Sequence, residues 1–128
     1  MKKLLSVCLV LLFSAGSALA QETANIAYKD NSVRFTVISD GTLRMEYSPS
    51  GNFTDNPSFV AINRVYPHVK YKLEQNNNKV VIFTDKLVMT YKKNSGMFSQ
   101  KNLSIVAAKK FFHFAWKPGM LQKGNLKG

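Results

Sequence analysis

Apolar and polar side chains alternate with period two after residue 24, and this alternation restricts the fold more than any other feature of the sequence. Successive side chains of a β-strand point to opposite faces, so the pattern is typical of strands with one face in a core. Turn residues separate the alternating runs, and no long window has helical periodicity. Many short strands divided in this way are typical of sandwiches and barrels. The sequence therefore predicts an all-β protein, an antiparallel β-sandwich.

The clearest hairpin lies in residues 32–48, where the turn sequence Ser-Asp-Gly at 39–41 separates two alternating runs. A two-residue Asp-Gly loop would mix apolar and polar positions on each face. A three-residue loop keeps one face apolar and sets Arg34 opposite Glu46 on the outer face. Such a loop requires a left-handed third residue, which we assign to Gly41. The expected apolar pairs are Val37 with Leu43, Phe35 with Met45, and Val33 with Tyr47.

A second group of strands is predicted in residues 68–93, with two-residue loops at Asn76-Asn77 and Asp85-Lys86. The expected pairs are Leu73 with Val80, Tyr71 with Ile82, Ile82 with Met89, and Val80 with Tyr91. Two more strands are expected in residues 102–107 and 111–116. The last of them would carry three aromatic residues on one buried face: Phe112, Phe114 and Trp116.

The first 20 residues predict an export signal. Two lysines precede an apolar run, and Ala-Leu-Ala at residues 18–20 fits the small residues that signal peptidase requires. We expect cleavage after Ala20, a periplasmic or secreted product, and one domain over residues 21–128. The apolar run is shorter than a bilayer span, so no stable membrane insertion is expected after cleavage. Cleavage also removes Cys8, the only cysteine, which leaves no disulfide.

The chain is basic, with 18 Lys and Arg residues against 7 Asp and Glu residues. Lysines interleaved with aromatic residues suggest either a nucleic-acid surface or strands with one wet and one dry face. No nucleic-acid motif is present and the chain is predicted to be exported, so we expect no nucleic-acid partner. An exported basic protein that binds anionic glycans or surfaces remains a further hypothesis.

The sequence contains no evident catalytic or metal-binding constellation. Asp55 and Glu74 are the acids without an evident role, and only a tertiary contact could pair them for glycoside hydrolysis. His68 and His113 lack the spacing of metal ligands. The long loop at residues 48–67 is rich in Ser, Asn, Pro and Gly, and loops of this length often contact a ligand or a neighbour. We therefore predict no catalytic residue, no metal site and no cofactor.

Three stretches resemble the N-terminal β-sandwich domain of glycoside hydrolase family 31, the α-glucosidases and α-xylosidases, in its exported bacterial form. They cover residues 41–64, 84–105 and 116–128. The first block matches at Leu43, Arg44, Glu46, Phe53, Asp55, Pro57, Ser58, Asn63 and Arg64. The second matches at Asp85, Leu87, Tyr91, Gly96, Phe98, Asn102 and Leu103. The third matches at Trp116, Pro118, Gly119, Asn125, Leu126 and Gly128.

The resemblance implies a galactose-mutarotase-like sandwich, incomplete at its C-terminus and truncated before the catalytic barrel. In that family the barrel carries the two catalytic aspartates and binds the carbohydrate, and no metal or organic cofactor is needed. The chain alone would be inactive, whereas its parent would hydrolyse α-linked glucosides or xylosides. A sandwich loop can reach the rim of the substrate pocket in relatives, and Phe53 and Asp55 are candidates for that contact. The alternative is a stand-alone exported carbohydrate-binding module.

Overall fold

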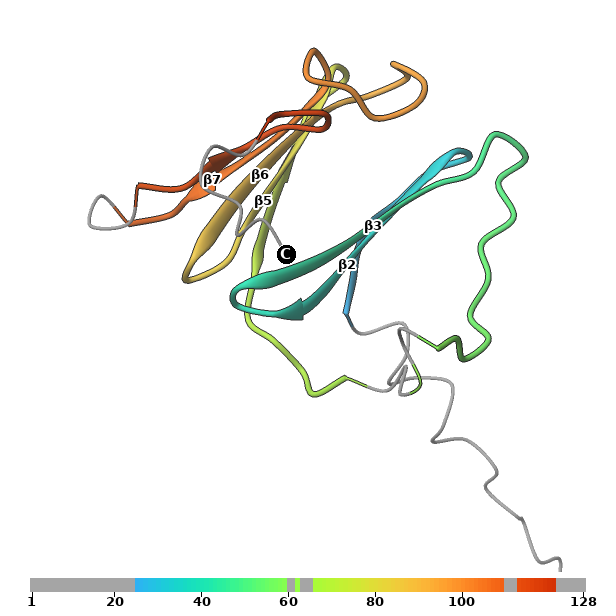
Figure 1. Ribbon diagram of the computed structural model, residues 1–128, viewed down its shortest axis with the longest axis horizontal. Coiled ribbons are helices and arrows are strands. Elements are labelled where there is room, and N and C mark those ends of the chain that lie inside the picture. The colour runs from blue at the N-terminus through green and yellow to red at the C-terminus, as the bar shows by residue number, and fades with distance from the viewer. Residues whose placement is uncertain (1–24, 60–61, 63–65, 110–112, 122–128) are drawn as a thin grey trace, which may run out of the picture.

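The computed structural model of the chain describes residues 25–59, 62, 66–109 and 113–121. Within these ranges it contains eight β-strands and no helix (Figure 1). The strands are β1 (Ile26–Lys29), β2 (Val33–Ser39), β3 (Thr42–Tyr47), β4 (Lys72–Gln75), β5 (Lys79–Phe83), β6 (Leu87–Lys92), β7 (Leu103–Ala107) and β8 (Ala115–Trp116). The predicted signal segment and Phe112 lie outside the described ranges, as do five residues of the resemblance: Asn63, Arg64, Asn125, Leu126 and Gly128. β1 has no counterpart among the predicted strands.

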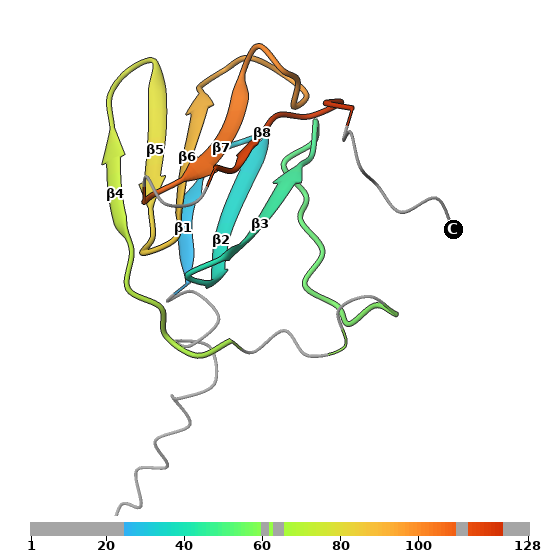
Figure 2. The ribbon, with the colours of Figure 1, turned by 60° about the vertical axis from the view of Figure 1, so that its left-hand side comes forward.

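The strands form two antiparallel sheets, and each sheet follows the order of the chain. β1, β2 and β3 form a three-stranded sheet, and β4 to β8 form a five-stranded sheet. Figures 1 and 2 show the sheets as two layers, with a long connection running from β3 to β4. The predicted all-β fold with antiparallel sheets in a sandwich arrangement is confirmed.

The core lies between the two sheets and is built around aromatic contacts. The ring of Phe35 on β2 stacks on Phe98, with centroids 5.7 Å apart, and meets Tyr91 on β6 edge-on at 5.2 Å. Offset and edge-on geometries are the arrangements that aromatic pairs favour. The buried core residues are Ala27, Val33, Phe35, Val37, Val80, Ile82, Met89, Tyr91, Leu103 and Ile105. Both sheets therefore contribute their predicted apolar faces.

Polar contacts join the sheets at their turns. Thr84 Oγ1 donates a hydrogen bond to the carbonyl oxygen of Asp40 at 2.5 Å, and Lys86 Nζ lies 3.2 Å from Asp40 Oδ2. At another point, Asn25 Nδ2 donates to the carbonyl oxygen of Pro67 at 2.8 Å. The first contacts join the β2–β3 turn to the β5–β6 turn, and the last joins the residue before β1 to the connection before β4.

The first hairpin has the predicted register but a different turn. Val37 pairs with Leu43, and Arg34 with Glu46, as expected. Ser39 then pairs with Thr42, and the register shifts between Val37 and Ser39, so a bulge precedes a two-residue Asp40–Gly41 turn. Gly41 does not have positive φ, so its left-handed assignment is wrong. The extra residue of the bulge restores the apolar pairing that a two-residue loop alone would disrupt.

The second group of strands confirms one predicted loop and corrects the other. The turn at Asp85-Lys86 gives the expected pairs, with Val80 opposite Tyr91 and Ile82 opposite Met89. The preceding turn lies at residues 77–78, one position later than predicted, so Leu73 pairs with Ile82 and Gln75 with Val80. The cause is the Asn76 side chain. Its Oδ1 accepts hydrogen bonds from the backbone N–H groups of Asn78 and Lys79, both at 2.9 Å, and so places the turn one residue later. The pairing moves by two residues, so the apolar face is unchanged.

The last predicted strand is shorter and more exposed than expected. β8 contains Ala115 and Trp116 alone and lies at the edge of the five-stranded sheet. Trp116 pairs with the buried Ile105 and is half-buried against the core. Phe114 is 46% exposed, so its predicted burial is wrong. It precedes the paired residues of an edge strand, where no other described strand covers it.

Candidate functional site

Phe53 and Asp55, the predicted rim residues, lie against the outer face of the three-stranded sheet. There they join Arg34 on β2 and Glu46 on β3, which are direct partners across the strands, and Arg44 on β3. We call these five residues the Arg34 cluster. Alternation along β2 explains the position of Arg34, because its neighbours Val33 and Phe35 point into the core.

Arg34 is held by two carboxylates at once. Its Nε donates to Glu46 Oε2 at 2.6 Å, and its Nη2 donates to Glu46 Oε1 at 3.0 Å. On the Asp55 side, Nη2 lies 2.6 Å from Oδ1, and Nη1 donates to Oδ2 at 3.1 Å. Arg44 Nη2 adds a contact of 2.5 Å to Glu46 Oε1. The planar guanidinium matches carboxylates in this two-pronged way, which lysine cannot do.

Phe53 closes the cluster from outside. The Arg34 guanidinium carbon lies 5.0 Å from the centroid of the Phe53 ring, and Lys29 Nζ lies 5.4 Å from it. Both distances are within the range of cation–π attraction. Arg44 Nη2 also donates to the carbonyl oxygen of Thr54 at 3.1 Å. Residues 53–55 are therefore fastened to the sheet, and Arg34 is only 4% exposed.

The electrostatics of the Arg34 cluster suit a structural contact that holds the loop on the sheet more than they suit a reaction centre. Hydrogen bonds from Arg34 to Glu46 and Asp55 outweigh burial and raise the pKa of the guanidinium above its usual range. Arg34 therefore stays charged and cannot exchange a proton near neutral pH. Glu46 and Asp55 both have their charge offset by Arg34, so neither is arranged as a free nucleophile or acid.

The alternating pattern indicates Glu46 as the partner of Arg34, but it does not indicate Asp55. Arg34 and Asp55 are 21 residues apart, and only the return of the loop brings them together. Nothing local in the sequence indicates that one guanidinium serves two carboxylates. The expected outer position of Arg34 is right, but burial by the loop makes it one of the least exposed charged residues described.

The other titratable residues do not converge on a second centre. Glu74 pairs with Lys72 at 2.7 Å on the surface, so the structure does not bring it together with Asp55. His68 and His113 are both exposed. In the described part of the chain, no group of three or more His, Cys, Asp or Glu residues could hold a metal ion.

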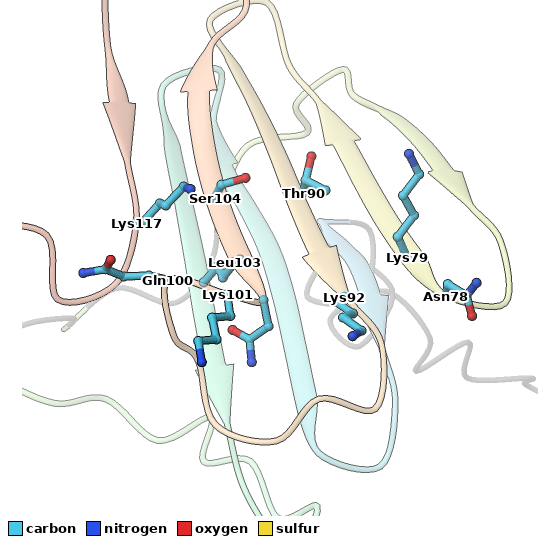
Figure 3. Close-up of a pocket in the computed structure, with 10 residues that line it drawn as sticks. Asn78, Lys79, Thr90, Lys92, Gln100, Lys101, Leu103, Ser104 and Lys117 are labelled. Atoms are coloured by element: carbon cyan, nitrogen blue, oxygen red, sulfur yellow. The ribbon is translucent and has the colours of Figure 1, made fainter.

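A basic hollow lies on the outer face of the five-stranded sheet, with a volume of about 610 Å³. Side chains from β5, β6 and β7 line it, together with residues of the loop before β7 and Lys117 after β8 (Figure 3). The lining residues are Asn78, Lys79, Thr90, Lys92, Gln100, Lys101, Asn102, Leu103, Ser104 and Lys117. The sequence pattern indicates only that these lysines lie on the solvent-facing sides of strands. The predicted β5–β6 register already implied that Lys79 faces Lys92.

No protein-family model matches the chain, and no curated protein sequence matches it either. Among the described residues there is no helix of sufficient length and apolarity to cross a membrane. The fold and the two surfaces above are therefore the basis on which a function is proposed.

Proposed function

We propose that this chain is the non-catalytic N-terminal β-sandwich portion of an exported, α-glucosidase-like glycoside hydrolase of family 31. The parent enzyme would hydrolyse α-linked glucosides or xylosides in its barrel, which would also bind the carbohydrate. The role of this portion would be to support that barrel. The proposal rests on the resemblance of three sequence blocks and on the places that the described residues of the first two blocks occupy in the fold.

The observation that carries the proposal is that residues of the first block meet in one cluster. Arg44 and Glu46 come from β3, whereas Phe53 and Asp55 come from the following loop, and all four converge around Arg34. A chance similarity in sequence has no reason to select residues that contact one another. The first block therefore corresponds to a structural unit, a strand with its returning loop.

Residues of the second block also have structural roles. Tyr91 and Phe98 lie in the aromatic core, with their ring centroids 5.9 Å apart. Asn102 Nδ2 donates to the carbonyl oxygens of Ser95 and Met97, and Gly96 in that loop has a φ of 73°. Such a backbone conformation favours glycine. These residues define the turn between β6 and β7, which supports a resemblance at the level of the scaffold.

The same geometry favours a scaffold over an enzyme. A retaining glycosidase needs two carboxyl groups that flank a sugar, one of them available as a nucleophile. Glu46 and Asp55 are the acids brought closest to a common partner, and both are committed to Arg34. Asp30 caps a turn, and Asp40 joins the two sheets.

The alternative, a stand-alone carbohydrate-binding module, would be favoured by a flat platform of exposed aromatic rings. Among the described aromatic residues, Phe59 and Phe114 are exposed, at 103% and 46%. Phe59 lies in the loop after β3, and Phe114 lies beside β8, so they belong to different parts of the fold. Most of the other described aromatic residues pack in or against the core, which favours a scaffold over a carbohydrate-binding module.

Two measurements test the proposal. The chain, purified to homogeneity, should not hydrolyse chromogenic α-glucosides or α-xylosides. The coding sequence beyond codon 128, in any frame, should encode further sandwich strands and a βα-repeat barrel. Turnover that disappears in Asp55→Asn but persists in Glu74→Gln, which pairs only with a surface lysine, would contradict a non-catalytic role. Downstream sequence without barrel repeats would contradict the family assignment.

A further inference from the structure

The basic hollow contains four lysines and no acid in its lining. Lys79, Lys92, Lys101 and Lys117 are exposed, and none of them forms an ion pair with a described residue. Elsewhere on the described surface, Lys72 pairs with Glu74 and Lys86 pairs with Asp40. The positive charge of the hollow is therefore concentrated and uncompensated.

The pairing of Lys79 with Lys92 is unfavourable in the free protein. These residues are direct partners across β5 and β6. Their neighbours Val80 and Tyr91 are fully buried on the core side, so alternation directs both lysines to the outer face. Like charges placed directly opposite on a sheet destabilise it. A bound anion would remove this repulsion, so the pair indicates a ligand with negative charge.

The remaining lining residues indicate what carries that charge. The side chains of Thr90, Ser104, Asn78 and Gln100 line the hollow and make no hydrogen bond to any described residue. These hydroxyl and amide groups are suited to the hydroxyl groups of a sugar chain. The lining contains no aromatic residue on which a neutral sugar or a nucleic-acid base would stack. It also contains no exposed apolar group that would enter a membrane.

We propose that this hollow binds an acidic polysaccharide, with Lys79 and Lys92 contacting its carboxylates and the neutral side chains contacting its hydroxyls. This inference deepens the proposed function, on which it rests for the carbohydrate partner. The site would hold the chain on an acidic glycan while the neutral substrate is processed elsewhere in the parent enzyme. Binding should weaken as salt rises, because exposed charges are screened within about 10 Å at 0.1 M ionic strength.

The test is calorimetric titration of the full chain with oligogalacturonate, at low and at high salt. We expect binding at low salt and at least about tenfold weaker binding by Lys79→Gln/Lys92→Gln, because the variant loses two charge-assisted contacts. The control is Lys70→Gln/Lys109→Gln, which removes the same charge from exposed lysines outside the hollow. It should change the affinity by less than about twofold. The first variant should melt no earlier than the unmodified chain, because it relieves a repulsion.

Several outcomes would overturn the inference. The first is absence of oligogalacturonate binding, and the second is equal weakening of binding in both double variants. The third is tighter binding of a thymidine decamer that depends equally on Lys79 and Lys92, which would assign the hollow to nucleic acid. Tighter binding of phosphatidylglycerol vesicles with the same dependence would assign it to a membrane. None of them bears on the family assignment, which the downstream coding sequence tests separately. Failure of one proposal can therefore be distinguished from failure of the other.

Discussion

Gly51 and Gly41 both lie in turns, but the two positions differ in how well they would accept a side chain. Gly51 has a φ of +74°, and a Cβ added there would lie 2.7 Å from the backbone oxygen of Asn31. A Cβ at Gly41 would meet only Lys86 Cδ, at an ordinary 3.6 Å. The first position combines a left-handed conformation with close backbone contact, whereas the second has neither.

We therefore expect Gly51→Ala to lower the free energy of unfolding by about 2 kcal/mol or more. Gly41→Ala, the matched control, should change it by less than about 0.5 kcal/mol. Urea denaturation of both variants measures the difference. Equal effects would mean that the loop after β3 moves freely enough to accept a side chain at residue 51.

Asp30 organises the turn between β1 and β2. Its Oδ1 accepts hydrogen bonds from the backbone N–H groups of Ser32 and Val33, both at 2.8 Å, and its Oδ2 accepts one from the Tyr28 hydroxyl at 3.0 Å. Burial alone would raise the pKa of this carboxyl, but the hydrogen bonds outweigh it and lower the pKa. Burial and Asp30 together raise the pKa of Tyr28 to about 12.

A carboxyl whose pKa is lower in the folded state stabilises the fold above its unfolded pKa, near 3.9. That contribution should disappear as the pH falls through the folded pKa. Asp30→Asn keeps an oxygen acceptor for the turn but cannot titrate. We expect the midpoint temperature of thermal unfolding to fall more steeply below pH 4 for the unmodified chain than for Asp30→Asn. Parallel curves would show that Asp30 titrates alike in both states.

At the scale of elements, the Arg34 cluster determines how the loop after β3 returns to the sheet. Removal of Arg34 would take away both contacts of Asp55 to the guanidinium and would leave Glu46 with Arg44. We expect Arg34→Met to destabilise the fold by about 2–4 kcal/mol, because breaking a buried pair leaves charge that is no longer fully compensated. The side chain of Asp55 is 51% exposed, so Asp55→Asn should cost less than about 1 kcal/mol.

Guanidinium chloride is a salt that would screen these charges, so urea should be used as the denaturant. Proteolysis provides a local measurement, since both variants should expose the loop near Phe53 to chymotrypsin. Combining Arg34→Met with Glu46→Gln and Asp55→Asn should recover part of the loss, because neither carboxylate charge is then left without the Arg34 guanidinium. A triple variant as unstable as Arg34→Met would show that packing of the Arg34 side chain matters more than its charge.

The hairpins also show which parts of the fold could be predicted from the sequence. Alternation gave the correct pairing of Val33 with Tyr47, Phe35 with Met45 and Val37 with Leu43, because a slip by one residue would move all these apolar side chains to the other face. The predicted turns at residues 39–41 and 76–77 were wrong. A bulge shortened the first loop to Asp40–Gly41, and the Asn76 side chain moved the second loop by one residue, with the apolar faces unchanged. The contact of Arg34 with Asp55 depends on the path of a whole loop, which no local pattern encodes.

For the whole molecule, Phe98 is the residue that joins both layers at one end of the core. Its ring lies 5.7 Å from Phe35 and 6.1 Å from Tyr47 of the three-stranded sheet, and 5.9 Å from Tyr91 of the five-stranded sheet. We expect Phe98→Ala to cost about 2–4 kcal/mol, through lost burial and lost aromatic contacts.

Phe114→Ala is the matched control, because the same ring is removed from a site that is 46% exposed. It should cost less than about 1 kcal/mol and could improve solubility by reducing the apolar surface. Differential scanning calorimetry of the two variants checks both values. A similar cost at the two positions would mean that the surface around β8 is covered in solution, by a second molecule for example.

The order of the strands within each sheet has a consequence for how this protein folds. Every described pairing joins strands that are consecutive in the chain, so each sheet is a simple meander. Topologies dominated by such local pairings fold faster than sandwiches whose neighbouring strands are distant in sequence. Each meander can begin to form as soon as its own hairpins close. The slow step is then the meeting of two preformed surfaces, and the transition state should contain Phe35 and Tyr91 in contact before the long connection settles on Arg34.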